Sequence, residues 1–156
     1  MTAPFEPVTI VEEWCYAVLS ANVTVTAEVG DRIYPAFSPA TITTRHLVHD
    51  FAGPDEGIAA VPMGQGIALL SMLWDVTAWE PREDRQLLRP VMKAVQAELA
   101  GSSIRGLSHR FGSADGSVWA LDVTYRGPIV VPADVGPPGV WQRVSARFEV
   151  RLRPVS

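Results

Sequence analysis

Three histidines and one cysteine are the side chains of this sequence best suited to metal binding or acid–base chemistry. His46 and His49 lie three residues apart on a segment predicted to be a strand, so their side chains point to opposite faces of a sheet. One metal ion could not easily be held by both, and the sequence has no second cysteine to complete a zinc site. We therefore expect His46, His49 and His109 to be ordinary surface or half-buried side chains. We expect Cys15 to be a buried structural thiol on the apolar face of a helix.

Motifs of nucleophilic catalysis and of phosphate binding are absent: there is no G-x-S-x-G, no Walker A pattern and no G-x-G-x-x-G. The segment Gly64-Gln65-Gly66 precedes a predicted strand, so the helix N-terminus that would bind a phosphate is missing. The carboxylates Glu80, Glu83 and Asp84 lie where a helix is predicted to start, and there they complement the helix dipole. The sequence therefore carries no recognised motif for catalysis, for a cofactor or for a metal.

Length and charge indicate one ordinary domain spanning residues 1–156, with a net charge of −4. The charge is uneven, because residues 1–31 are acidic and residues 140–156 are rich in arginine. These segments are interpreted either as solvated faces or as an acidic edge and a basic edge that meet between copies. No basic block is dense enough to indicate sequence-specific nucleic-acid binding. The longest apolar run, residues 66–73, is too short to span a membrane, and no signal peptide is visible.

Two main helices are predicted. The first begins near Thr9, because Thr9 and Glu12 form a capping box, and it carries an apolar stripe that includes Trp14 and Cys15. The second spans residues 82–100, and we expect Pro90 to kink it; the alternative is a short helix that ends before Pro90 and a second that begins there. Periodicity does not decide whether residues 22–29 are helical or extended.

Strands are predicted at residues 32–34, 43–51, 66–79, 103–111, 118–126 and 140–152. In the last strand, Phe148 and its even-numbered neighbours face one way, whereas Trp141 and the arginines face the other. The predicted fold class is α+β, with a mostly antiparallel mixed β-sheet and both main helices packed on one face. The Pro- and Gly-rich segments 53–66 and 127–139 are predicted to be long loops.

Trp141 shares its predicted face with three arginines. Tryptophan and arginine are enriched at protein interfaces, so Trp141 is a candidate anchor for a partner. The alternative is a tryptophan covered by arginine on the surface of a monomer. The sequence does not choose between these two interpretations.

Five segments together resemble a known family. Residues 30–35 have the sequence G-D-R-I-Y-P and follow shortly after a predicted helix ending A-V-L-S-A at residues 17–21. Residues 73–79 form a central strand that leads into a long helix over residues 85–99, and residues 141–150 form the closing strand. In order and spacing, these segments resemble the tail-terminator (tail-completion, minor tail) proteins of long-tailed phages, the siphophages.

This resemblance implies a structural virion protein that is not an enzyme and binds no cofactor and no metal. Such a subunit forms a homo-oligomeric ring, expected to be a hexamer, that caps the tail tube, stops its polymerisation and provides the surface for head attachment. The implied partners are further copies of the chain, the tail-tube protein and the head–tail connector or stopper protein. No membrane is involved, and DNA would pass through the ring. The implied location is the head-proximal end of the virion tail, after assembly in the host cytoplasm.

The expected partner-binding residues fall into two groups. The expected subunit-interface residues are Arg32, Tyr34, Trp141, Arg143 and Arg147. The expected residues of loops that face the tube or the connector are Asp55, Glu56, Met63 and Asp134. This chain departs from the family in the apparent length of both loops and in Arg45-His46 and His49-Asp50, where the family is often aromatic.

Two other functions remain open. A different head–tail joining protein or a tail-tube-like structural protein shares the size and the mixed sheet. A small α+β ligand-binding domain would require a concave pocket with convergent polar groups, and the sequence shows no such group of residues.

Overall fold

The computed structural model describes residues 6–53, 59–62, 68–129, 134–136 and 139–155. In chain order the elements are α1 (Glu6–Ala21), α2 (Val23–Val29), β1 (Ile33–Pro35), β2 (His46–Gly53), β3 (Ala59–Pro62), β4 (Ala68–Glu80), the 3-10 helix η1 (Arg85–Leu88), α3 (Arg89–Ala100), β5 (Leu107–Gly112), β6 (Val118–Ile129), β7 (Asp134–Gly136) and β8 (Gly139–Val155).

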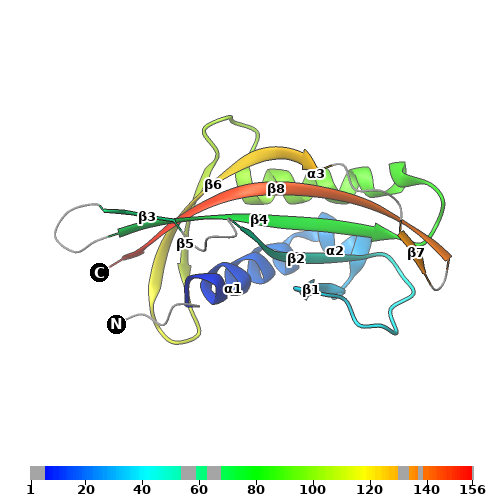
Figure 1. Ribbon diagram of the computed structural model, residues 1–156, viewed down its shortest axis with the longest axis horizontal. Coiled ribbons are helices and arrows are strands. Elements are labelled where there is room, and N and C mark those ends of the chain that lie inside the picture. The colour runs from blue at the N-terminus through cyan, green and yellow to red at the C-terminus, as the bar shows by residue number, and fades with distance from the viewer. Residues whose placement is uncertain (1–5, 54–58, 63–67, 130–133, 137–138, 156) are drawn as a thin grey trace.

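One curled sheet organises these elements, in the order β1-β2-β4-β8-β6-β5 (Figure 1). The short strand β3 extends the sheet by pairing with β4, and β7 pairs with β8. Only β1 and β2 run parallel; every other described pairing is antiparallel. The predicted α+β class, with a mostly antiparallel mixed sheet, is confirmed.

The sheet has one apolar face, and the helices pack on it. Along β4, Met72, Trp74, Val76 and Ala78 are at most 1% exposed, and their neighbours in sequence are partly exposed. Because side chains alternate along a strand, this pattern assigns one face of β4 to the core. The core residues of α1, α2 and α3 belong to the same cluster as this face. No helix in the described part of the chain is long and apolar enough to cross a membrane.

The N-terminal helix begins earlier than predicted. Helix α1 starts at Glu6, so Thr9 lies inside the helix and the predicted capping box is wrong. Pro7 occupies the first turn, where a missing backbone N–H has no helical partner to lose. Residues 23–29 are the separate helix α2, because the Asn22 side chain caps it by accepting a hydrogen bond from the Val25 amide at 3.0 Å.

The turn after α2 explains the glycine of the G-D-R-I-Y-P segment. Gly30 adopts φ +61° and donates its amide to the Thr26 carbonyl at 2.8 Å, which ends the helix. This conformation favours glycine because a side chain would clash with the backbone. The chain then reverses into β1, and Leu47 of β2 donates its amide to the Arg32 carbonyl at 3.0 Å.

The predicted kink at Pro90 is wrong, because the helix is split. The 3-10 helix η1 ends at Leu88, and α3 begins at Arg89 with Pro90 in its first turn. A proline there needs no carbonyl partner, so the break avoids the cost of an interior proline. Leu88 and Val91 are both fully buried on either side of the break, which is why the apolar stripe in the sequence continues through it.

Several predicted boundaries are corrected by the sheet. Strand β5 starts at Leu107, because residues 103–106 form a turn in which the Gly106 amide bonds the Ser103 carbonyl at 3.0 Å. The segments predicted to be long loops contain β3 and β7, and β6 continues to Ile129. Proline and glycine were misleading here, since a strand that pairs along only one edge tolerates both.

Candidate functional site

The face of the sheet turned away from the helices is the candidate interaction surface, and we name it the open face. Across its two central strands, the cross-strand partners on this face are Leu73 and Glu149, Asp75 and Arg147, Thr77 and Ser145, and Trp79 and Arg143. No described helix contributes core residues to this face. It therefore offers a polar surface with one aromatic region, on the most regular part of the fold.

A ladder of polar contacts crosses the middle of the open face. Arg147 forms a bidentate pair with Asp75, with nitrogen–oxygen distances of 2.9 and 3.0 Å, and this hydrogen bonding raises the pKa of Arg147. One row away, the hydroxyl oxygens of Thr77 and Ser145 lie 2.9 Å apart. Ser145 is only 3% exposed, although it lies on the face opposite the core residues of β8.

Farther along β8, Glu149 receives two arginines. Arg151 donates to it at 2.6 Å, and Arg126 of β6 forms an ion pair with its other oxygen. Both guanidinium groups are about half exposed, whereas the carboxylate is 11% exposed. The open face is therefore held together by charge pairs within the chain.

An aromatic cluster occupies the other end of the open face, where β2, β4 and β8 meet. The ring of His46 stacks on Trp79 at 6.0 Å between centroids, and Trp141 meets both rings edge-on at 5.3 and 6.2 Å. Tyr34 of β1 lies edge-on to His46 at 6.0 Å, and the guanidinium carbon of Arg143 lies 4.9 Å above the Trp79 ring. We name these five residues the aromatic patch.

His46 is held as a neutral, oriented ring. Its Nδ1 lies 2.8 Å from the Thr44 carbonyl, so this nitrogen carries the proton and donates it. Burial lowers the pKa of His46 more than the Thr44 contact raises it, and the charge of Arg32 lowers it further. The prediction of surface or half-buried histidines is wrong for His46 and His49, which are 2% and 0% exposed, because strand β2 lies between β1 and β4.

Four of the five predicted interface residues gather around this aromatic patch. Tyr34, Trp141 and Arg143 belong to it, and Arg32 lies beside it, with Nε donating to the Arg45 carbonyl at 2.8 Å. Arg147 lies farther along β8, in its pair with Asp75. Trp141 is only 7% exposed, so Tyr34 and Arg143 present more of the aromatic patch to a partner than Trp141 does.

The predicted tube- or connector-facing residues are placed only in part. Asp55, Glu56 and Met63 lie outside the described residues. The backbone of Asp134 opens strand β7 and pairs with Trp141, so this segment adjoins the end of the aromatic patch.

Sequence reasoning missed a buried ion-pair network at the end of β4. The side chain of Glu80 is 1% exposed and accepts hydrogen bonds from Arg45 at 2.5 Å and from Arg82 at 2.7 Å. Burial alone would raise the pKa of Glu80, but the hydrogen bonds from Arg82 and Arg45 outweigh it and lower the pKa. Glu80 therefore does not serve the helix dipole; Asp84 caps η1 instead, accepting from the Gln86 amide at 2.9 Å.

Two features of the described residues concern metal binding and thiol reactivity. They contain no group of three or more His, Cys, Asp or Glu side chains that could hold a metal ion. Cys15 is buried on α1 as predicted, and burial raises the pKa of its thiol, which keeps it in the unreactive protonated form. Nε2 of His109 lies 2.8 Å from the Leu99 carbonyl, where the ring bridges β5 and α3.

Comparison with known proteins gives a fold relationship. No protein-family model matches this sequence, and no curated protein matches it. Among solved structures, the chain is similar to one from the "Virion of native gene transfer agent (GTA) particle". The two chains are 14% identical with a TM-score of 0.58, and the similarity covers 89% of this chain and 91% of the other. The shared architecture therefore extends over nearly the whole of both chains.

Proposed function

We propose that this chain is a structural virion protein that acts as a tail terminator, with the whole of residues 1–156 as the assembly unit. Six copies form a ring that caps the tail tube, stops its polymerisation and presents the surface to which the head connector attaches. The chain catalyses no reaction and works in the virion, at the head-proximal end of the tail. Its partners are further copies, the tail-tube protein and the connector or stopper protein.

One observation carries this proposal: the same architecture, over nearly the full length of both chains, occurs in a subunit of a gene transfer agent virion, which is a phage-like particle. Fold alone does not define function. The G-D-R-I-Y-P turn adds support, because it forms the α2–β1 reversal and places Tyr34 in the aromatic patch.

The aromatic patch is proposed to take part in the contact between subunits. Tyrosine, tryptophan and arginine are the residue types that dominate the energetics of interfaces. Arg143 lies over the ring of the half-buried Trp79, and this contact orders its guanidinium group, so a partner would meet a charge that is already held in place. Arg32 lies beside this patch, and Arg147 lies farther along β8 in its pair with Asp75.

The proposal is tested by the assembly state, alone and on tubes. Light scattering over a range of concentrations and negative-stain imaging should show hexamer-sized rings, or rings that form on the ends of purified tail tubes and halt their growth. Long tubes formed by this chain alone would show a tube-like protein instead. A chain that neither assembles nor binds tube ends is not a terminator.

A matched pair of variants tests the aromatic patch. Arg143→Glu should weaken ring formation without unfolding the chain. Arg153→Glu changes an exposed residue of the same strand outside the patch and should assemble as wild type. Equal assembly of both variants would remove the patch from the subunit interface.

A further inference from the structure

A groove lies between α3 and the curled end of the sheet. It encloses about 460 Å³, within the range of roughly 300–1,000 Å³ typical of clefts that hold small molecules. Its apolar walls come from Met92 on the helix side and from Tyr125, Pro128, Val144 and Ala146 on the sheet side. The groove therefore has room and apolar surface for an aromatic side chain.

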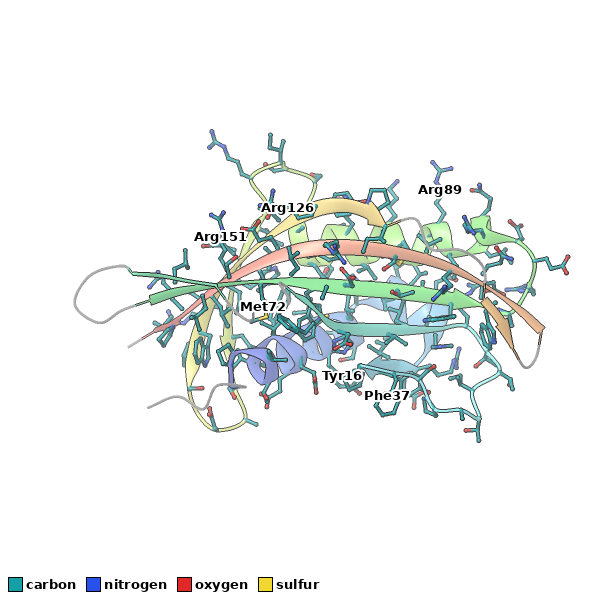
Figure 2. All side chains as sticks on the ribbon, in the orientation of Figure 1. Tyr16, Phe37, Met72, Arg89, Arg126 and Arg151 are labelled. Atoms are coloured by element: carbon teal, nitrogen blue, oxygen red, sulfur yellow. The ribbon has the colours of Figure 1, made fainter. Side chains whose placement is uncertain are left out.

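The helix side of this groove is lined by cations. Arg85, Arg89 and Lys93 recur every four residues along η1 and α3, so they follow one side of the helix and all three are exposed. In the described part of the chain, no carboxylate lies within ion-pair distance of any of them. Figure 2 shows Arg89 pointing away from the sheet. We name these three residues the basic rim.

A cluster of opposite charge lies on α1 and β2. Glu12 and Glu13 are neighbours on the helix, and Asp50 of β2 is close enough for its charge to act on Glu12. Burial raises the pKa of Glu12, and repulsion by Asp50 and Glu13 raises it further, so this cluster has an excess of negative charge. Glu13 has neutral donors, namely the Ser113 hydroxyl at 3.1 Å and the Ala114 amide at 3.3 Å.

Tyr16 stands one helical turn after Glu12 and projects from the same side of α1. It is 46% exposed, which makes it one of the few large apolar side chains exposed in the described part of the chain. An exposed tyrosine with acidic neighbours is a suitable anchor for a basic groove, because tyrosine buries a large area with few rotatable bonds.

The two surfaces lie on opposite sides of the molecule. In Figure 2, Tyr16 lies below β4 and β8 in the view and Arg89 lies above them, so one copy cannot bring its own two surfaces together. In a ring, each subunit meets its neighbours through two different surfaces. Given the ring proposed above, we infer that Tyr16, Glu12 and Asp50 of one copy dock into the basic rim and groove of the next copy.

This contact would remove two charge imbalances at once. The basic rim would gain carboxylate partners, and the repulsion within the acidic cluster would be offset by cations. The phenol ring of Tyr16 would cover apolar groove wall that is open in the single chain. Asp50 also lines a second cavity with Trp79 and Arg143, so the acidic cluster is continuous with the aromatic patch.

Charge reversal tests this contact. The variant Arg89→Glu/Lys93→Glu changes the basic rim, and Glu12→Lys/Asp50→Lys changes the acidic cluster. Each variant alone should associate at least roughly tenfold more weakly than wild type, because like charges then face each other. A mixture of the two variants should assemble again, since each reversed surface then meets a reversed partner. Circular dichroism and thermal melting confirm that both variants are folded.

A cross-linking experiment separates this contact from the ring itself. In a Cys15→Ala background, a chain with Tyr16→Cys and Gln96→Cys should form a ladder of disulfide-linked multimers, because Gln96 lines the same groove. A control chain with Tyr16→Cys and Arg153→Cys should not. Covalent multimers without closed rings would support the contact and refute the terminator role.

The opposite results are equally clear. Rings that form normally from both charge-reversed variants would overturn the inferred contact and leave the terminator role standing. If the basic rim variant lost binding to a DNA duplex but kept its rings, the groove would serve nucleic acid instead of a second copy.

Discussion

Acid should destabilise this protein through His49, and the size of the effect follows from the structure. His49 is 0% exposed under the helices, and within the described residues neither of its ring nitrogens has a hydrogen-bond partner. Its nearest ring is Trp74, at 5.9 Å. Burial in this apolar site lowers the pKa of His49 from 6.5 to about 4, because the charged imidazolium would lose its hydration.

The sign of the effect is set by proton uptake. Between pH 6.5 and about pH 4, the unfolded chain binds a proton at His49 and the folded chain does not. The free energy of unfolding therefore falls as the pH drops through this window, by about 1.4 kcal/mol per pH unit. Over this whole window the expected loss is about 3 kcal/mol, a large fraction of an ordinary domain's stability.

The variant His49→Leu isolates this contribution, because leucine is apolar, similar in volume and unable to titrate. Urea unfolding of both proteins should be measured from pH 7.5 to pH 4. Carboxylates contribute equally to both proteins, so the difference between their unfolding free energies reports His49. The wild type should lose about 3 kcal/mol relative to the variant across this range.

An NMR titration of the His49 imidazole is the matching control. In the folded protein, the NMR chemical shifts of the His49 ring protons should stay at the values of neutral imidazole down to about pH 4. Parallel stability curves for wild type and variant would refute the reasoning. They would mean that the folded chain accepts the proton, which requires water or a carboxylate beside the ring.

Three further changes should affect the stability of the fold. Glu80→Leu removes the buried carboxylate that joins Arg45 and Arg82, and Arg45 keeps its ion pair with Glu28, so the free energy of unfolding should fall by about 2 kcal/mol in urea titrations. Gly106→Ala should lower the free energy of unfolding by more than about 1 kcal/mol, since φ is +79° and a Cβ would lie 2.1 Å from the Val123 carbonyl oxygen. The control Gly112→Ala should be nearly neutral, because its Cβ would meet nothing within 4 Å. Asn22→Ala removes the cap of α2 and should lower the melting temperature by an amount equivalent to about 1 kcal/mol.

The sequence was most informative where a local pattern decides the structure. In β8 the alternation of side chains assigns Ala146, Phe148 and Val150 to the core, and all three are buried. In α3 the apolar period places Val91 and Val95 against the sheet, and both are fully buried. These predictions need only the geometry of one element, because a strand repeats every two residues and a helix every 3.6.

The sequence was least informative where the partner lies far along the chain. The alternation of β8 places Glu149 on the same face as Trp141 and the arginines, yet Glu149 is 9% exposed because Arg126 and Arg151 converge on it. The role predicted for Glu80, at the start of a helix, is wrong because the carboxylate binds two arginines instead. One of them, Arg45, lies 35 residues earlier in the chain. Such pairs depend on strand register, which periodicity alone does not specify.

Backbone signals from proline also misled in a specific way. Pro90 was placed in a helix interior because the apolar stripe continues through it, but a 3-10 turn followed by a new helix keeps the same side chains inward. The sequence indicated only part of the aromatic patch. Trp141 was recognised from its arginine neighbours, whereas His46 and Trp79 come from strands that join it only through the pairing of β4 with β2 and β8.

The distribution of paired and unpaired charges bears on where assembly should occur. On the open face, Asp75 and Glu149 are already neutralised by arginines of the same chain, so that face is stable without a partner. The basic rim and the Glu12–Asp50 cluster have no such compensation among the described residues. If the proposed ring forms, such a subunit gains electrostatic energy when a neighbour arrives, because its basic rim and its acidic cluster lie on two different surfaces. Salt should therefore weaken assembly far more than it weakens folding, since screening acts on exposed charges and leaves the apolar core intact.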